Sequence, residues 1–267
     1  MTSNSLTSTG IPSHPADNRA YLEQESLSRA RWLRAGGKLE EWDNSVQEDV
    51  SFAMDILDLG ENDTVLNIGC GWGQHAITLA YFGHKVIGVE ISSHLLKLAQ
   101  ETSQEAGVLV EWVQGDISDA QLSKPVSAVV QFHGNLLNWA DGPTGALHQL
   151  FQAHAVLEEQ GQLLFGSPEW VEEPVHRNQG FSKNSDGEAV HRHFFDTKTR
   201  TAQSQTIITG TDGTTRELWR RNWHPTGAQM ESLLYQAGFI VLAKFNDFRP
   251  FAYSAEHPGL VWLAAKR

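Results

Sequence analysis

The stretch that decides the fold reads Val-Leu-Asn-Ile-Gly-Cys-Gly-Trp-Gly and occupies residues 65–73. Its first four residues are mostly apolar and predict a buried strand, and the glycines behind them predict a tight turn into a helix over 74–82. These glycines stand two residues apart, at Gly69, Gly71 and Gly73. A dinucleotide-binding loop needs a glycine at position 74, where this chain has Gln74. The spacing instead favours a nucleoside whose tail carries no pyrophosphate.

Short apolar runs alternate with helical stretches on both sides of this loop. Strands are expected at 65–68, 86–89, 108–113, 126–132 and 162–165, and helices at 74–82, 95–106 and 146–157. A helix over 226–237 and an antiparallel pair, 239–245 with 260–265, close the pattern. This alternation predicts an α/β fold with a doubly wound, seven-stranded, mainly parallel sheet.

The chain divides into four parts by the same patterns. Residues 1–20 read as a flexible tail, and 21–62 as a helical lead-in with an apolar stripe. Residues 63–267 read as the α/β domain, interrupted at 167–224 by an antiparallel β insertion with strands near 189–195, 202–209 and 215–223.

The charge balance restricts the partners. Lysine and arginine number 20 against 32 acidic residues, which gives a net charge of −12. Such a surface repels phosphate backbones and anionic lipid, so nucleic acid and membranes are not expected as partners. The single cysteine and the polar first residues predict a cytoplasmic protein. A homodimer stays open as its assembly, and no metal site is expected.

Two carboxylates follow the loop at strand ends. Glu90 ends the second expected strand, 21 residues after Gly69, where it can accept hydrogen bonds from both hydroxyls of a ribose. Asp116 lies just beyond the third strand and can reach an exocyclic amino group of a base. The loop and the two acids in this order are a stronger signal than the glycines alone.

Together, residues 65–73, Glu90, Asp116 and the seven-strand pattern resemble the class I S-adenosylmethionine-dependent methyltransferases. The resemblance covers about residues 46–267 and implies a Rossmann-like methyltransferase fold that binds S-adenosyl-L-methionine and releases S-adenosyl-L-homocysteine. It implies that Gly69, Gly71 and Gly73 pass the methionine part, that Glu90 holds the ribose, and that Asp116 with Ile117 borders the adenine. Asn67 stands where the family usually has Asp or Glu, so it brings no negative charge to the cofactor's ammonium group.

The exit of the fourth strand is the expected place for the methyl acceptor, because ligands of such sheets lie at the carboxyl ends of the strands. Gly134-Asn135 and the apolar residues after it are similar to glycine N-methyltransferase and related small-molecule N-methyltransferases. His133 is the candidate base, with acceptor positioning or a structural role as alternatives. Asn135, Trp170 and Arg221 are candidate acceptor contacts.

The sequence therefore predicts an enzyme that moves a methyl group to a nitrogen of a small polar molecule, such as an amine or amino-acid-like compound. An O- or C-methyltransferase of a small aromatic metabolite is the nearest alternative, because its donor site would be identical. A protein that binds S-adenosylmethionine without turnover is the alternative from another class.

Overall fold

The computed structural model describes residues 44–120, 122–132, 142–166, 178–184, 187–249 and 261–267. Seven strands form one sheet in the order β10-β11-β5-β4-β1-β2-β3. The parallel strands are β1 (Thr64–Ile68), β2 (Lys85–Glu90), β3 (Glu111–Gln114), β4 (Val126–Gln131) and β5 (Leu157–Gly166). The antiparallel pair is β10 (Phe239–Phe245) and β11 (Val261–Lys266). The predicted doubly wound, mainly parallel sheet is confirmed.

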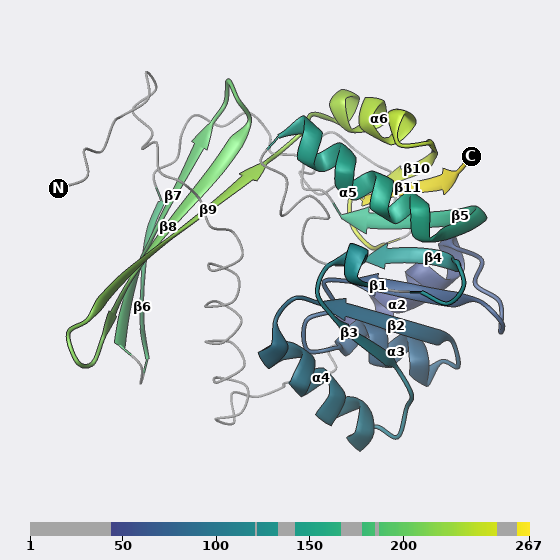
Figure 1. The fold of residues 1–267 in the computed structure, drawn as a ribbon, viewed down its shortest axis with the longest axis horizontal. Coiled ribbons are helices and arrows are strands. Elements are labelled where there is room, and N and C mark those ends of the chain that lie inside the picture. The colour runs from purple at the N-terminus through teal and green to yellow at the C-terminus, as the bar shows by residue number, and fades with distance from the viewer. Residues whose placement is uncertain (1–43, 121, 133–141, 167–177, 185–186, 250–260) are drawn as a thin grey trace.

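Helices cover both faces of this sheet (Figure 1). On one face, α5 (Pro143–Val156), the 3₁₀ turn η1 (Ile117–Asp119) and α6 (Gly227–Gln236) share a large buried cluster with the sheet. On the other, α2 (Asn44–Ile56) and α3 (Gln74–Tyr81) share a second cluster, and α4 (Ser93–Glu105) packs on β2 and β3. These two apolar layers bury both faces, which is what a parallel sheet requires.

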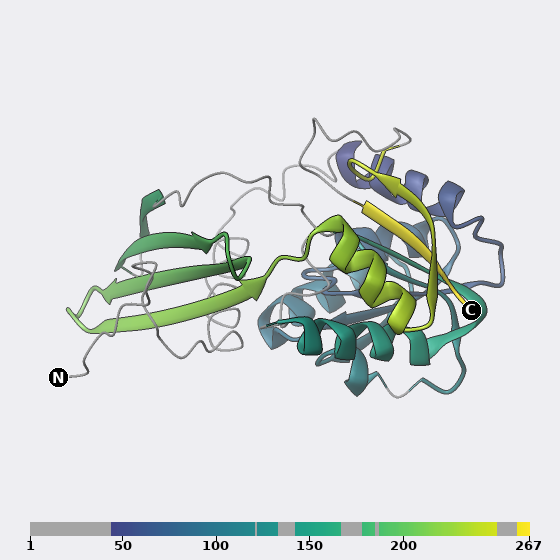
Figure 2. The same cartoon turned by 90° about the horizontal axis from the view of Figure 1, so that it is seen from above.

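A separate four-stranded antiparallel sheet follows β5 in the chain. Its strands are β6 (Asn178–Asn184), β7 (Gly187–Asp196), β8 (Thr201–Gly210) and β9 (Thr215–Trp223), paired in that order. Figures 1 and 2 show it standing beside the seven-stranded sheet. The sequence predicted three strands here and missed β6, because Asn-Gln-Gly-Phe-Ser-Lys-Asn has no apolar alternation.

The last strand of the inserted sheet is anchored in the core of the α/β domain. Trp223, at the end of β9, is 5% exposed and belongs to the cluster formed with α5 and α6. The next residue, His224, donates its backbone N–H to the carbonyl of Arg200 at 2.8 Å, and Arg200 Nε donates to the His224 carbonyl at 2.7 Å. The two hydrogen bonds extend the pairing of β8 and β9 by one residue, and Trp223 anchors the inserted sheet to the core of the α/β domain.

Several element boundaries differ from the sequence prediction. β3 begins at Glu111 rather than 108, and Leu109 is 94% exposed. The helix expected over 146–157 spans Pro143–Val156, and β5 starts at Leu157 rather than at 162. Gln160, with φ of 66°, accompanies the irregular start of β5 beside β4. Side chains cap two of the helices, with Ser92 at the start of α4 and Thr226 at the start of α6.

Candidate functional site

The glycine loop is tied to the end of the neighbouring strand. Gly71 N–H donates to Glu90 Oε2 at 2.9 Å, and Cys70 N–H donates to the carbonyl of Val89 at 3.0 Å. Gly71 has φ of 59°, and a Cβ there would meet no atom within 4 Å. Its backbone conformation, rather than crowding, therefore requires glycine. These two hydrogen bonds fix the loop at the carboxyl ends of β1 and β2.

The floor of the loop is formed by a tryptophan on β3. A Cβ on Gly88 would lie within 2.4 Å of the Trp112 ring, and a Cβ on Gly73 would lie within 2.8 Å of it. Trp112 also donates its indole N–H to Ser103 Oγ at 3.3 Å. The absence of side chains at these two glycines makes room for the Trp112 ring.

Glu90 is a buried carboxylate that holds two backbone groups. Glu90 is only 8% exposed. Its Oε1 accepts a hydrogen bond from Ser92 N–H at 2.8 Å, and its Oε2 accepts one from Gly71 N–H. Burial raises the pKa of Glu90, and the backbone hydrogen bonds partly oppose this shift. Each carboxylate oxygen has a second lone pair, so Glu90 can still accept from ribose hydroxyls, as the sequence predicted.

Two buried amide oxygens flank the start of the loop. Asn67 is 2% exposed and its Nδ2 donates to the Val130 carbonyl at 3.3 Å, while its Oδ1 has no hydrogen-bond partner among the described residues. Gln131, at the end of β4, is 6% exposed, and within the same part of the chain its Oε1 also lacks a partner. Asn67 pairs in register with Val130, so the two amides approach the loop from opposite faces of the sheet. At this edge of the sheet both oxygens are available to a donor from a ligand.

The N-terminus of α3 points its backbone donors at the same loop. Gly73 is the N-cap residue, and it provides no side-chain cap. Helix N-termini attract carboxylates and other anions because their first N–H groups have no partner in the helix. Acceptors at Asn67 and Gln131 and donors at α3 together fit a zwitterionic α-amino acid, which is the tail of S-adenosylmethionine.

Asp116 and Ile117 follow β3, next to Glu90. Gly115 N–H donates to the backbone carbonyl of Glu90 at 3.0 Å, which places this turn against the end of β2. Asp116 is exposed and caps η1, with Oδ1 accepting from Ser118 N–H at 2.8 Å. Ile117 is 5% exposed and packs into the core cluster. Contacts of these two residues with adenine stay a prediction.

Sequence reasoning missed a polar network that joins three segments beside the loop. Asp49 on α2 has a side chain only 3% exposed, with Oδ2 3.3 Å from His75 Nε2 and Oδ1 3.3 Å from an Arg249 nitrogen. Arg249 also lies 3.0 Å from a carboxylate oxygen of Glu48. The His75 ring stacks on Phe132 at 4.3 Å between centroids. His75 lies in the first turn of α3, directly after the glycine loop. This position next to the loop was the only feature of the sequence that could have pointed to the network.

Four acceptor-site predictions remain to be placed. His133, Asn135 and Trp170 lie outside the described residues. Arg221 is half-buried on β9, in register with Gln203 on β8, and therefore belongs to the inserted sheet. The structure thus brings Asn67, the glycines, Glu90 and Asp116 to one sheet edge, and it places Arg221 on a different sheet.

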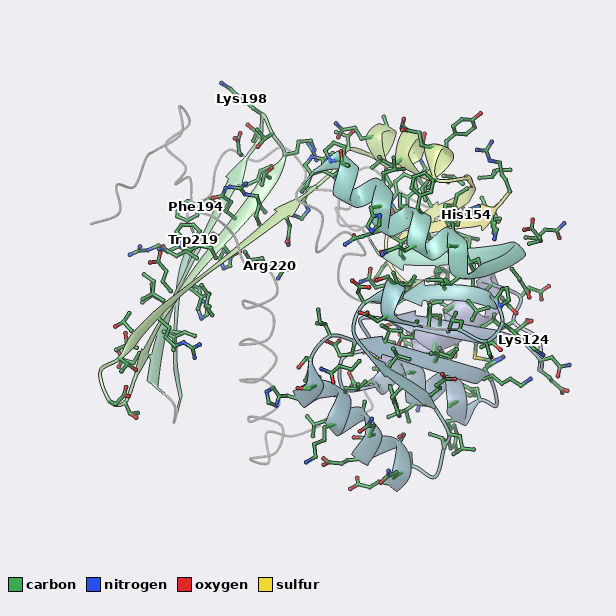
Figure 3. All side chains as sticks on the ribbon, in the orientation of Figure 1. Lys124, His154, Phe194, Lys198, Trp219 and Arg220 are labelled. Carbon is green, nitrogen blue, oxygen red and sulfur yellow. The ribbon has the colours of Figure 1, made fainter. Side chains whose placement is uncertain are left out.

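The aromatic residues of the inserted sheet are largely used within it. Phe194 and Trp219 stack with their ring centroids 6.3 Å apart and lie together in Figure 3. Trp219 donates its indole N–H to Glu217 Oε1 at 2.7 Å, and Gln205 donates to the same oxygen at 2.6 Å. This pair of rings is explained by packing and needs no ligand.

Comparison with known proteins gives a consistent picture. Residues 65–161 match the family model described as a methyltransferase domain. The chain is 24% identical over 142 residues to a Saccharomyces cerevisiae protein named as a probable S-adenosylmethionine-dependent methyltransferase, which covers 49% of this chain and 47% of that protein. It is 31% identical over 77 residues to a 23S rRNA uracil C5-methyltransferase of Stenotrophomonas maltophilia, which covers 28% of this chain and 17% of that protein. The chain thus spans less than half the length of these curated relatives.

Solved structures match over most of the chain. The CcbJ methyltransferase from Streptomyces caelestis is 21% identical with a TM-score of 0.68, and the match covers 83% of this chain and 90% of that chain. An S-adenosylmethionine-dependent methyltransferase from Clostridium acetobutylicum is 13% identical with a TM-score of 0.71, covering 90% and 99%. The sugar N-methyltransferase KedS8 from Streptoalloteichus sp. is 14% identical with a TM-score of 0.60, covering 88% and 92%.

The chain has the fold of the class I S-adenosylmethionine-dependent methyltransferases, and residues 65–161 match the methyltransferase-domain model. No helix in the described ranges is both long and apolar enough to span a membrane.

Proposed function

We propose that this protein transfers a methyl group from S-adenosylmethionine to a nitrogen of a small polar molecule. The observation that carries the donor half is the loop edge itself, where Gly71 is tied to buried Glu90 and the orphaned Asn67 Oδ1 lies beside it. These groups match the ribose hydroxyls and the ammonium of the donor.

Each residue of this edge has a separate task in the proposal. Glu90 holds the ribose and at the same time fixes the loop through Gly71. Asn67 accepts from the ammonium, and the N-terminus of α3 binds the carboxylate. Asp116 and Ile117 border the adenine at the end of β3. The order of the tasks follows the order of neighbouring strands β3, β2 and β1.

Methyl transfer needs positioning more than covalent help from the protein. When bound, the donor supplies an electrophilic methyl group on a sulfonium. The nitrogen lone pair of the acceptor forms the new N–CH₃ bond as the S–CH₃ bond breaks, and a proton leaves the nitrogen. The products are the methylated acceptor, S-adenosylhomocysteine and a proton. His133 is the proposed proton acceptor, because it directly follows Phe132 at the exit of β4.

A small acceptor is favoured over nucleic acid by the net charge of −12, which opposes binding of a phosphate backbone. A nitrogen acceptor is supported by the Gly134-Asn135 pattern and by the fold likeness to a sugar N-methyltransferase. Asn135, Trp170 and Arg221 are the proposed acceptor contacts. Methylation of an oxygen or carbon on a small aromatic is the competing outcome.

The test is transfer of label from methyl-labelled S-adenosylmethionine into pooled small molecules, with amines, amino acids, amino sugars and phenols as separate fractions. We expect label in an amine-bearing fraction and on its nitrogen. Label only in phenols would move the acceptor atom to oxygen. Binding of the donor without any transfer would identify a protein that holds the cofactor without turnover.

The proposed role of His133 has its own test. If His133 takes the proton, His133→Ala slows methylation by roughly 10²- to 10⁴-fold with little change in cofactor affinity. His133→Asn keeps hydrogen-bonding capacity but does not titrate. Recovery of the rate in the Asn variant alone would assign His133 to acceptor positioning, and unchanged rates in both would make it structural.

A further inference from the structure

We infer that Gln131 is a cofactor-positioning residue whose Oε1 accepts a hydrogen bond from the ammonium group of the amino-acid tail. The inference rests on the proposed function and adds a residue to the donor site. Gln131 ends β4, is 6% exposed, and carries a buried oxygen without a partner among the described residues. A buried acceptor in this state destabilises the protein unless a donor reaches it.

The position of Gln131 relative to the loop is defined by one close approach. A Cβ built on Gly69 would lie 3.6 Å from Gln131 Nε2, so the amide of Gln131 reaches the first glycine of the loop. Gly69 has φ of 61°, which turns the chain at this point. The side-chain amide is thus beside the loop that is expected to pass the methionine part.

The order of the strands decides which part of the ligand Gln131 can meet. Along the carboxyl edge the neighbours run β3, β2, β1 and β4. Asp116 follows β3 and Glu90 ends β2, so the adenine and ribose occupy that side. β4 lies on the opposite side of β1, roughly 10 Å from β2 at ordinary strand spacing. The tail of the nucleoside is the part that extends in this direction.

The chemistry of the tail selects the group. Its carboxylate only accepts hydrogen bonds and fits the N-terminus of α3, whereas its ammonium only donates, with three N–H groups. Asn67 and Gln131 stand near the carboxyl ends of the neighbouring strands β1 and β4, and each carries a buried acceptor oxygen for an ammonium at this edge. Two neutral amides would then do what a single carboxylate usually does, without burying a further negative charge near Glu90.

The experiment compares two ligands by isothermal titration calorimetry. S-adenosylhomocysteine carries the amino-acid tail, and 5′-methylthioadenosine has the same nucleoside and thioether but no amino acid. We expect Gln131→Leu to weaken the binding of S-adenosylhomocysteine about tenfold, which corresponds to the loss of one charge-assisted hydrogen bond. The affinity for 5′-methylthioadenosine should not change. The melting temperature of the free variant should hold or rise, since Leu removes an unpaired buried oxygen.

Gln162→Leu is the matched control. Gln162 on β5 also has a buried Oε1 without a described partner, but it pairs with Ala128, away from the carboxyl edge. Its substitution should change neither affinity. Gln131→Glu, a second variant at the site, keeps an acceptor and adds charge, so S-adenosylhomocysteine should bind at least as tightly as to the unchanged protein.

The outcomes separate the inference from the proposed function. Equal weakening of both ligands by Gln131→Leu would assign the residue a structural role, and no weakening of either would also overturn the inference. If the unchanged protein binds neither ligand, the proposed donor is wrong and the inference falls with it. If Gln131→Leu does not fold, weaker binding of S-adenosylhomocysteine to Gln131→Glu decides against the role.

Discussion

Glu90 combines two tasks in one carboxylate, and this makes its substitution more disruptive than a lost ligand contact. Its oxygens accept from Gly71 N–H and Ser92 N–H, so Glu90→Ala releases the loop and also removes the proposed ribose contact. We expect S-adenosylhomocysteine to bind more weakly by roughly 2 to 4 kcal/mol, measured by calorimetry. An unchanged dissociation constant in a folded variant would place the ribose elsewhere.

The raised pKa of Glu90 also predicts a pH dependence. The ribose prefers the ionised carboxylate, and burial raises the pKa of Glu90 above the ordinary 4.5. Affinity for S-adenosylhomocysteine should therefore fall on acidification, with a midpoint above that value. Glu90→Gln should flatten the profile, whereas Glu101→Gln, at an exposed carboxylate on α4, should keep it. A profile that persists in Glu90→Gln would assign the titration to another group.

At the residue scale, the sequence predicted the groups whose chemistry is visible in a motif. The glycines at 69, 71 and 73 and Glu90 were predicted from their spacing relative to a strand, and the structure brings the loop and Glu90 together. Gln131 was not found, because an amide at the end of an apolar run is equally typical of a solvated strand end. Its burial and its lack of a described partner are properties of the packed molecule.

At the scale of elements, the network around Asp49 fastens α2 to the helix that follows the loop. Asp49→Ala removes the shared partner of His75 and Arg249. Arg249 is about a third exposed and keeps its ion pair with Glu48 in this variant. The loss of folding free energy should therefore be smaller than for a buried charge left without any partner. We expect a loss of about 1–3 kcal/mol in urea unfolding.

Glu48→Gln is the control for this network, because the Glu48 side chain is 59% exposed. An exposed ion pair contributes at most about 1 kcal/mol, so this variant should unfold near the midpoint of the unchanged protein. Equal losses in the two variants would show that the buried carboxylate has no special role in holding α2.

The junction between β9 and α6 predicts a second pH effect. Burial, with the nearby charges of Arg200 and Arg220, lowers the pKa of His224 from 6.5 to about 4. The unfolded chain therefore binds a proton at His224 before the folded chain does. Stability from this residue is complete above pH 6.5 and is lost as the pH falls toward 4, by about 3 kcal/mol at 1.36 kcal/mol per pKa unit.

Urea unfolding between pH 7 and 4 measures this loss. His224→Gln should show a smaller fall in unfolding free energy over that range, although other acidic groups titrate in both proteins. The exposed His94→Gln on α4 serves as the matched histidine control. If the His224 variant follows the same pH curve as the unchanged protein, the residue is not the source of the effect.

Element prediction succeeded where periodicity and caps agree and failed where polar sequence forms strands. The core strands and α4 were predicted from pattern alone, and the structure adds the Ser92 cap of α4. β6 and the start of β5 were missed, because Asn178–Asn184 and residues 157–161 are mostly polar. In the structure all of β6 pairs with β7, and Leu157 pairs with Val126. Partner strands distant in sequence decide such segments.

At the scale of the whole molecule, the two sheets suggest a division of labour between donor and acceptor. The residues proposed for the cofactor lie on the seven-stranded sheet, whereas Arg221 lies on β9 of the inserted sheet. β9 runs from the distal turn near Thr215 to Trp223, which is anchored in the core cluster (Figure 2). Arg221 is therefore on the part of the strand that meets the α/β domain.

If Arg221 binds an anionic group of the acceptor, Arg221→Ala should raise the KM for that acceptor about tenfold or more and leave the affinity for S-adenosylhomocysteine unchanged. Glu90→Ala should do the reverse: it should weaken cofactor binding and have less effect on the KM for the acceptor, measured at saturating donor. Arg216→Ala is the matched control, because Arg216 is an exposed arginine at the distal end of the same strand. An Arg221 variant that loses cofactor affinity instead would mean that the inserted sheet serves the donor site, and the division between the two sheets would have to be abandoned.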